Sequence, residues 1–452
     1  MKGELGMKIA IIGCGYVFDI YMRTLRAHPE LEIMGVYDRV VERTKRVSEY
    51  YGFRAYTSYS EVLTDEEVET VVNLTNIGSH FEVSRKALNA GKHVYSEKPL
   101  TKDLDQSREL FRIASERGVR LYGAPSNIYS DTSRTVLTSV SEGLIGKPLL
   151  VYAELDDSPI HLMGFDGVVS RTGAPWPLQE EVREGCTFEH LGYHLVWICA
   201  LLGPAVSVTA FSSELIEGKA QGLPGFVGTP DYSVANLQFA NGAVARITCS
   251  VVAPRDHSFR VIGRDGQLSV EGYRRYRSPV RIERFTKASL MGRKFDTLQR
   301  HPMLSSFLGI GGRRVELARN WKSEAVEKDN QIRSSRKQRV IEWLRRREVY
   351  AQDKLVGVAE MAKEIKERRE QYLTPEFLLH LNELTLLTQG ARAGIAVSPT
   401  TTFEPLGPVP GTRVTGTAPR LATSRALGRL VSLFCRQQPA STQQNTHVVV
   451  SR

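Results

Sequence analysis

The stretch Lys8-Ile-Ala-Ile-Ile-Gly-Cys-Gly15 is the part of the sequence that decides the fold. Its unbroken apolar run, residues 9–12, predicts a strand over residues 8–12 that is buried on both faces, and apolar residues at helical spacing follow the glycines. A glycine turn between a buried strand and a helix lets the pyrophosphate of a dinucleotide approach the backbone. The third glycine that is usual in this fingerprint is missing. The stretch predicts a nucleotide site formed by Gly13, Gly15, Tyr16 and Val17.

Strand and helix signals alternate as far as residue 125. Further strands are predicted at residues 31–37, 68–74, 93–96 and 120–122, and helices at residues 40–51, 79–90 and 104–117. Regular alternation with right-handed crossovers produces a doubly wound parallel sheet. We therefore assign residues 1–125 to an α/β Rossmann domain.

Polar residues follow two of these strands, at the sheet edge where doubly wound folds bind ligands. The Asp38 carboxylate can accept hydrogen bonds from the adenosine ribose and would repel the extra phosphate of NADP, or it can cap the next helix. The neighbouring Arg39 can instead pair with that phosphate. Glu97, Lys98 and Pro99 follow the strand at residues 93–96. We predict NAD as the cofactor, with NADP as the alternative.

The pattern changes after residue 125, where strands follow one another. In the runs 235–239 and 245–249 apolar and polar residues alternate, and the Asn241-Gly242 pair between them is a strong hairpin signal. Half-polar alternation is typical of an antiparallel sheet with one exposed face. Residues 126–395 are therefore predicted to form an α+β domain with a large, mainly antiparallel open sheet. Helices are predicted within it at residues 129–142, 188–202, 354–367 and 375–393.

The net charge of +10 on the 452 residues is concentrated in two segments. Residues 313–348 carry a net charge of +6 and residues 396–452 a net charge of +5, so the main body is close to neutral. We interpret residues 293–350 as a basic helical insertion. Residues 396–452 are rich in Thr, Pro, Gly, Ser and Gln, which predicts a disordered tail. A neutral main body argues against nucleic acid as the main partner.

The cysteines and the apolar runs indicate the cellular compartment. The five cysteines are scattered and form no C-x-x-C pair, which argues against a disulfide scaffold and a zinc ribbon. The longest apolar stretch, residues 195–206, is too short to span a bilayer. These features predict a cytoplasmic protein without a membrane partner.

Taken together, these motifs resemble the Gfo/Idh/MocA oxidoreductases, the group of glucose–fructose oxidoreductase and inositol dehydrogenase. The resemblance covers about residues 7–395 without the basic insertion, and the Glu-Lys-Pro block within residues 90–100 is its most specific piece. It implies reversible hydride transfer between a dinucleotide and a sugar or cyclitol carbon. It also implies that the nicotinamide lies near a set of polar residues, namely Thr75, Asn76, His80, Glu97 and Lys98.

One helix motif departs from the family. His194 matches the family's histidine, but His190 stands where its aspartate is usual, and Glu189 would point about 100° away from that position. The resemblance implies that Lys98 and His194 handle the proton of the substrate hydroxyl, with His190 orienting His194 or contacting the sugar. The alternative is a pair of packed helix histidines. Histidines at i and i+4 can bind zinc, but no third ligand is evident, so we assign no metal.

The predicted activity is that of an NAD-dependent dehydrogenase acting on a sugar, amino sugar or cyclitol hydroxyl. Trp176 lies in a proline-rich segment and can stack on a sugar ring or simply anchor its loop. We also expect a homo-oligomer formed through the open sheet. Two alternatives stay open: a glycosidase of similar fold that uses bound NAD transiently, and a non-catalytic nucleotide-binding regulator. Net NADH production from a free sugar would separate the dehydrogenase from the glycosidase.

Overall fold

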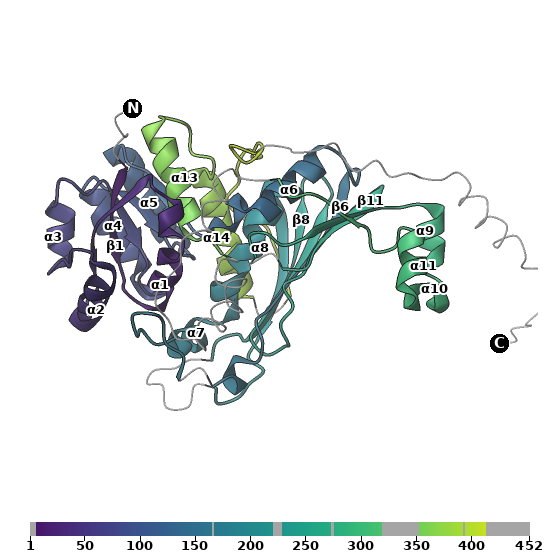
Figure 1. The fold of residues 1–452 in the computed structure, drawn as a ribbon, viewed down its shortest axis with the longest axis horizontal. Coiled ribbons are helices and arrows are strands. Elements are labelled where there is room, and N and C mark those ends of the chain that lie inside the picture. Colours follow the sequence, from purple (N-terminus) through teal and green to yellow (C-terminus); the bar gives the residue numbers. More distant parts are fainter. Residues whose placement is uncertain are drawn as a thin grey trace, which may run out of the picture.

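The computed structural model describes residues 6–164, 167–219, 228–272, 275–318, 352–391 and 394–412. Two sheets organise these residues (Figure 1). The N-terminal sheet has five strands, and the second sheet, drawn mostly in teal, has nine. The fold class predicted from the sequence is confirmed.

The first sheet is parallel and has the strand order β2-β1-β3-β4-β5. Its strands are β1 (Met7–Ile12), β2 (Leu31–Tyr37), β3 (Thr70–Asn73), β4 (His93–Ser96) and β5 (Leu121–Gly123). The connecting helices are α1 (Tyr16–Met22), α2 (Val41–Tyr51), α3 (Tyr59–Thr64), α4 (His80–Asn89) and α5 (Leu104–Arg117). Every residue of β1 except Lys8 is buried, as its apolar run predicts for a central strand.

Helix α13 (Leu355–Lys366) comes late in the chain but packs on this first sheet. Its buried residues Val358 and Met361 share one hydrophobic core with Ile9 of β1. Gly357 permits the close approach, because a Cβ at this position would lie 2.4 Å from the Tyr95 hydroxyl. This helix therefore packs on the first sheet, although it lies within residues 126–395, which the sequence assigned to the second domain.

The second sheet has the order β13-β12-β11-β10-β6-β9-β8-β7-β14, and all its pairs are antiparallel except β6 with β9. The strands are β6 (Pro148–Asp156), β7 (Ala205–Ser213), β8 (Tyr232–Phe239), β9 (Val244–Ser250), β10 (Phe259–Gly263), β11 (Gly266–Val270), β12 (Val280–Arg284), β13 (Arg313–Arg314) and β14 (Ala396–Val397). The Asn241-Gly242 turn joins β8 to β9, as the sequence predicts, and Gly242 has a φ of 83°.

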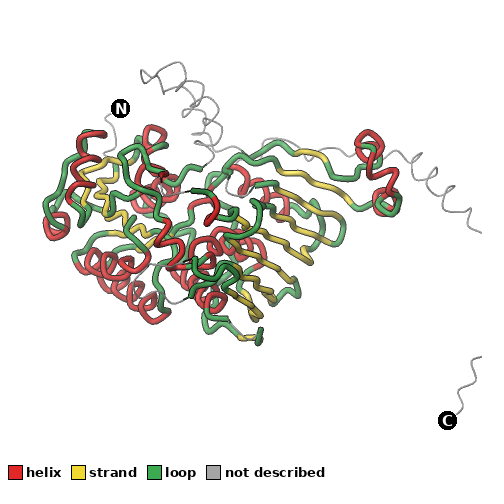
Figure 2. Tube along the Cα trace, turned by 90° about the horizontal axis from the view of Figure 1, so that it is seen from below, coloured by secondary structure: helices red, strands yellow, loops and turns green. Residues whose placement is uncertain are grey.

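Helices cover one face of this sheet (Figure 2). They are α6 (Asp131–Ser141), α7 (Leu178–Glu184), α8 (Cys186–Leu202) and α14 (Pro375–Gln389). α8 packs on β6, β8 and β9 and also against α14, α7 and α6, which explains why it is apolar around most of its circumference. The ring of Trp197 meets Phe259 of β10 edge to face, with 5.3 Å between the ring centroids.

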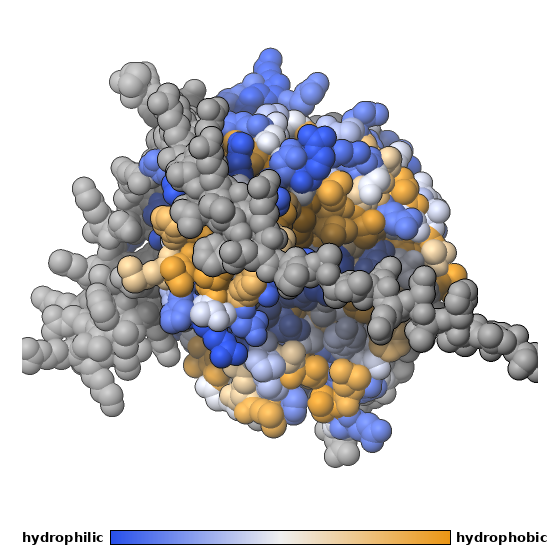
Figure 3. All heavy atoms as spheres, turned by 90° about the vertical axis from the view of Figure 1, so that its right-hand side faces the viewer, coloured by the Kyte–Doolittle hydropathy of each residue, from blue (hydrophilic) through white to orange (hydrophobic). Residues whose placement is uncertain are grey.

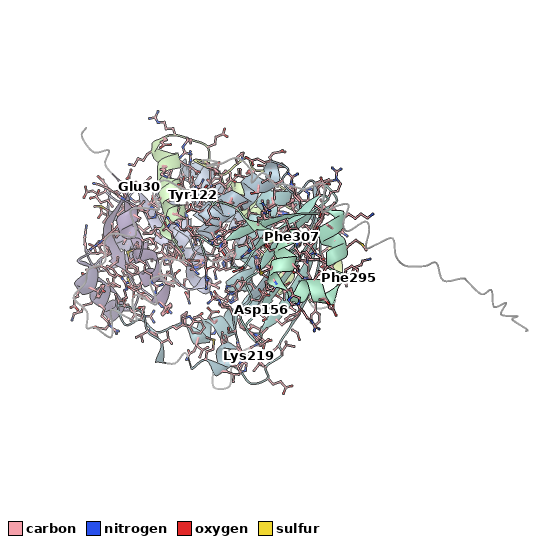
Figure 4. All side chains as sticks on the ribbon, turned by 45° about the vertical axis from the view of Figure 1, so that its right-hand side comes forward. Glu30, Tyr122, Asp156, Lys219, Phe295 and Phe307 are labelled. Atoms are coloured by element: carbon pink, nitrogen blue, oxygen red, sulfur yellow. The ribbon has the colours of Figure 1, made fainter. Side chains whose placement is uncertain are left out.

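A short helical arm extends from the sheet beyond β12 (Figures 1 and 4). It consists of α9 (Lys287–Gly292), α10 (Asp296–Arg300) and α11 (Pro302–Phe307), and it exposes the apolar side chains of Phe295 and Phe307. Helices occur here, as predicted for the basic insertion, but residues 319–350 of that insertion lie outside the described residues.

The predicted disordered tail is wrong for residues 396–412. β14 pairs with β7, and the side chains of Phe403 and Val409 are buried. Hydrogen bonds fix the backbone between β14 and Phe403: the Glu383 carboxylate accepts one from the Thr400 N–H and one from the Thr401 N–H. The composition of the tail did not predict this order, because a few apolar residues and a buried partner are enough to order a segment. Residues 413–452 lie outside the described residues.

None of the helices in the described ranges combines the length and the apolar character that a membrane crossing requires.

Candidate active site

A cleft of about 710 Å³ lies between the two domains, at the carboxyl ends of β1, β2, β3 and β4. α7 and α8 of the second domain form its opposite wall. All the residues predicted to hold the cofactor line it, namely Gly13, Gly15, Tyr16, Val17, Asp38, Arg39, Thr75, Asn76, His80, Glu97 and Lys98. Trp176 and His190 also line the cleft, whereas His194 does not.

The glycine turn leaves the cleft open where a ligand would approach. Gly13 has a φ of 100°, and a Cβ there would lie 2.5 Å from the Leu74 carbonyl oxygen. Only glycine fits this position without strain. A Cβ at Gly15 would meet no heavy atom within 4 Å, so the space above this glycine is free.

The Asp38 carboxylate braces the turn from the end of β2. Its Oδ2 accepts a hydrogen bond from the Cys14 N–H at 2.8 Å, and its Oδ1 accepts one from the Val40 N–H at 2.8 Å. Asp38 is buried, yet it still lines the cleft. Because a carboxylate oxygen can accept more than one hydrogen bond, both oxygens keep capacity for a ligand hydroxyl. Arg39 and Arg43 line the cleft at this same end.

His80 ties the end of β3 to the segment after β4. Its Nδ1 lies 2.8 Å from the Pro99 carbonyl oxygen and its Nε2 lies 3.1 Å from the Thr75 carbonyl oxygen. Burial lowers the pKa of His80 in spite of these two carbonyls. The Thr75 hydroxyl donates to Asn73 at 2.6 Å. His80 therefore holds the walls of the cleft together in addition to lining it.

Glu97 is a buried carboxylate with three hydrogen-bond donors. Its Oε1 accepts hydrogen bonds from the Tyr21 hydroxyl and from Lys354 Nζ, both at 2.9 Å, and its Oε2 accepts one from the Lys98 N–H at 3.1 Å. Burial alone would raise the pKa of Glu97, but Lys354 and Lys98 lower it to about 2. Glu97 is therefore ionised at neutral pH.

Lys98 reaches across the cleft to Glu189 of α8, with 2.6 Å between Nζ and Oε2. Burial alone would lower the pKa of Lys98, but the Glu189 carboxylate raises it above its usual value. The Tyr193 ring centroid lies 5.7 Å from the same ammonium. Glu189 and His190 both line the cleft, although their side chains are expected to point about 100° apart on α8.

The two histidines of α8 lie in different environments. His190 lines the cleft, and its Nε2 lies 4.0 Å from Glu181. His194, one turn later, is fully buried: its Nε2 donates to the Glu154 carbonyl oxygen at 2.8 Å and its ring stacks on Phe259. Burial lowers the pKa of His194 to about 3, so it is neutral. The structure does not bring His194 together with Lys98, because α8 turns this side chain towards the sheet.

Trp176 lies in a loop that crosses from the second domain to α1. The N–H and the hydroxyl of Thr172 both donate to Asp19 Oδ2 at 2.9 Å, and the Tyr51 hydroxyl donates to the other oxygen at 2.7 Å. Asp19 is buried in α1 beside the glycine turn. Trp176 is half-buried, so it both anchors this loop and presents a surface to the cleft.

Two family models match the chain. The model described as "Oxidoreductase family, NAD-binding Rossmann fold" matches residues 7–124, and the model of the GFO/IDH/MocA C-terminal domain matches residues 133–269. Together they account for more than half of the sequence. The chain belongs to the GFO/IDH/MocA family. The family and the oxidoreductase class predicted from the sequence are thereby confirmed.

Individual members of the family are similar over most of their length. The myo-inositol 2-dehydrogenase of Thermotoga maritima is 25% identical over 273 residues, which are 59% of this chain and 76% of that protein. The structure of KijD10, a 3-ketoreductase from Actinomadura kijaniata in complex with TDP-benzene and NADP, superposes with a TM-score of 0.59 at 20% identity, covering 86% of this chain and 98% of that chain. The structure of the WlbA dehydrogenase from Bordetella pertussis in complex with NADH and UDP-GlcNAcA superposes with a TM-score of 0.61 at 18% identity. This match covers 88% of this chain and 99% of that chain. At these identities the two structures show a shared fold.

Sequence reasoning missed three residues of this GFO/IDH/MocA cleft. Lys354 precedes α13 and carries no local signal, since it is 257 residues from its partner Glu97. Tyr193 lies between the predicted histidines, and its hydroxyl oxygen accepts a hydrogen bond from Lys354 Nζ at 3.4 Å. Arg43 was detectable, because it follows Arg39 by four residues at the start of a predicted helix.

Proposed function

We propose that this chain catalyses reversible hydride transfer between NAD and a secondary hydroxyl carbon of a sugar, amino sugar or cyclitol. The observation that carries the proposal is the position of Lys98, which lines the cleft between the glycine turn and α8 and is paired with Glu189. The relatives named above include a myo-inositol 2-dehydrogenase and a 3-ketoreductase. Both act at a hydroxyl or keto carbon, as this arrangement requires.

The first domain offers what a dinucleotide needs. The open space above Gly15 and the backbone of the Gly13 turn fit a pyrophosphate. Asp38 fits the adenosine ribose, and Thr75, Asn76, His80 and Glu97 fit the nicotinamide end. When bound, the dinucleotide supplies or accepts the hydride. These residues would orient it, and Trp176 lines the cleft from the second domain.

We favour NAD over NADP because the Asp38 carboxylate faces the cleft at the ribose end and would repel another phosphate. Arg39 and Arg43 oppose this preference, since two guanidinium groups near one point attract a phosphate. The carboxylate is the fixed group of the three, because two backbone N–H groups hold it in place.

Lys98 is our candidate for proton transfer. Its ammonium, stabilised by Glu189, is the form that donates a proton to a carbonyl oxygen as the carbon gains a hydride, giving a hydroxyl group. In the reverse direction the lysine must first lose that proton, so oxidation should require a higher pH than reduction. His190 lines the cleft near Glu181 and is placed to contact the sugar. His194 is left out of this assignment because it is buried in the core.

We also propose that the second domain forms a homo-oligomer through its open sheet. The exposed side chains of Leu149 and Phe211 lie on or beside its strands, and Figure 3 shows apolar patches between polar side chains on the face seen from the side of the arm. Uncovered apolar surface of this kind is typical of subunit contacts. Light scattering of wild type and Phe211→Asp should show a loss of mass in the variant.

The proposed function is tested by a substrate panel. Wild-type protein is incubated with NAD or NADP and with free sugars, amino sugars, cyclitols and nucleotide sugars, and reduced dinucleotide is followed by absorbance. Net reduction with at least one sugar-like alcohol is the expected result. Sugar cleavage without net reduction would support the glycosidase alternative instead. Dinucleotide binding without any turnover would support a regulator.

A further inference from the structure

Lys354 contacts both sides of the cleft. It immediately precedes α13, is 9% exposed and lines the cleft beside Lys98 and Glu189. Its Nζ donates to Glu97 Oε1 at 2.9 Å, and it lies 3.4 Å from the Tyr193 hydroxyl on α8. One ammonium group thus joins the first domain to the helix that carries Glu189.

Glu97 needs this ammonium. A buried carboxylate without a cation pays a large desolvation cost unless it takes up a proton. Lys98 is the other cation near Glu97, but its ammonium contacts Glu189 and only its backbone N–H bonds Glu97. Lys354 is therefore the side-chain cation that the structure shows in direct contact with Glu97.

Two ion pairs lie side by side in this part of the cleft. Lys354 pairs with Glu97, and Lys98 pairs with Glu189. The Tyr193 ring is near both ammonium groups, with its centroid 5.9 Å from Lys354 Nζ and 5.7 Å from Lys98 Nζ. If Lys354 were removed, Glu97 would be left with Lys98 as its nearest cation. The Lys98 ammonium would then be shared by two carboxylates and drawn away from its place at α8.

We propose that Lys354 is a positioning residue for proton transfer: by bonding Glu97 and the Tyr193 hydroxyl, it keeps the Lys98 ammonium directed towards Glu189 and the cleft. The inference rests on the proposed function, because it assigns the proton to Lys98. Lys354 acts through these neighbours and needs no contact with the substrate. Glu97 in turn holds the backbone of Lys98 through its Oε2.

The first test uses stability and needs no substrate. In the wild type the pKa of Glu97, about 2, lies below its unfolded value, so its contribution to stability is present above about pH 4.5 and is lost only as the pH falls towards 2. In Lys354→Met the buried carboxylate loses its main cation, and its pKa should rise above the unfolded value. Stability should then fall as the pH rises from about 5 to 8, seen as a declining urea midpoint. The other titratable or charged groups around Glu97 are Lys98, Tyr21, Tyr95, Tyr193, His80 and Glu189.

Two further variants make this test specific. Lys354→Met/Glu97→Gln should lose the new pH dependence, because no carboxylate is left to titrate, and it serves as the folded variant if the single change unfolds the protein. Lys363→Met is the matched control, since Lys363 lies on the same helix and pairs with Glu360 at 2.7 Å away from the cleft. It should keep the wild-type profile. A urea midpoint in Lys354→Met that follows the wild type at every pH would overturn the inference.

The second test uses turnover. Lys354→Met should lower kcat by about tenfold to a hundredfold, a typical range for a displaced acid–base group, while the dinucleotide Kd changes by less than about twofold. Its kcat should also decline as the pH rises through the new Glu97 ionisation, and Lys354→Arg should restore most of the rate. Wild-type kcat and an unchanged pH profile in Lys354→Met would overturn the inference. If the wild type turns over no substrate of the panel, the proposed function fails, whereas the stability test still decides whether Lys354 controls the charge of Glu97.

Discussion

The two ends of the cleft are built in opposite ways. The end that fits the adenosine is lined by one short stretch of chain, from Ile12 at the end of β1 to Arg43 in α2. The other end combines Lys98 with α7, α8 and Lys354, and its shortest ion pairs join residues 91 and 257 positions apart. Local sequence therefore determines the first end, while packing of the two domains determines the second. Substitutions at the two ends should therefore have different effects: those near Lys98 should change kcat, and those near Asp38 should change the Kd of the dinucleotide.

The largest effect is expected for Lys98→Ala. A lost acid–base group should lower kcat by about 10²–10⁴-fold, whereas the Kd of the dinucleotide should stay within about twofold, since the glycine turn is untouched. Both values are measured on a substrate found in the panel. Lys86→Ala, an exposed lysine on α4, is the control and should behave as wild type. Near-full activity of Lys98→Ala would transfer the proton-transfer role to another group in the cleft, with His190 as the first candidate.

His194→Ala should act on stability. The side chain is fully buried, and its loss leaves a cavity and an unsatisfied Glu154 carbonyl, at a cost of about 2–4 kcal/mol in the free energy of unfolding. Denaturant unfolding measures this, with His190→Ala as the comparison. His190→Ala should instead impair turnover or substrate KM. A strong loss of turnover in a stable His194→Ala protein would contradict the structural role.

His194 also predicts a pH dependence of stability. Its folded pKa of about 3 lies below its unfolded value of about 6.5, so the unfolded state binds the extra proton between these limits. Stability should therefore fall as the pH is lowered from about 6.5 towards 3, by up to about 1.4 kcal/mol per pH unit from this group. Urea midpoints are measured for wild type and His194→Gln between about pH 3 and pH 6.5. The difference between the two proteins gives the contribution of His194 to the pH dependence of stability.

The sequence predicted one by one the residues that line the cleft at the glycine turn, and it predicted the lining of the other end in part. Gly13, Gly15 and Asp38 could be placed because a strand, a turn and the next strand end fix their positions. Glu189 lines the cleft and His194 does not. Helical periodicity could not show this, because it gives the angle between two side chains but not which side of α8 faces the cleft. Lys354 could not be found, since its partner is distant in sequence and its own neighbourhood is ordinary. The ordering of residues 396–412 was missed for the same reason.

Glu189→Gln is expected to shift a pH profile. The Glu189 carboxylate raises the pKa of Lys98, so removing its charge should lower that pKa and let the lysine lose its proton at lower pH. The pH at which alcohol oxidation reaches half its maximal kcat should fall by about one unit or more, which corresponds to about 1.4 kcal/mol. Glu116→Gln, which breaks an exposed ion pair with Arg112 on α5, is the control. An unshifted profile would show that the pair at Lys98 does not control the proton.

The smallest effect is expected at the adenosine end, for Asp38→Ser. Serine removes the charge that repels another phosphate but keeps a hydroxyl for hydrogen bonding. NAD binding should weaken and NADP binding should improve, each by about 1–2 kcal/mol, measured as Kd by fluorescence titration. Part of the NAD loss should arise in the turn itself, because Asp38 holds the Cys14 and Val40 N–H groups. Adding Arg39→Ala should cancel much of the gain in NADP affinity if that guanidinium attracts the phosphate.

The kcat at saturating dinucleotide should hardly change, since Lys98 and Glu189 lie at the other end of the cleft. A wild type that already prefers NADP would show that Arg39 and Arg43 outweigh Asp38, and a large fall in kcat would show that the two ends are coupled.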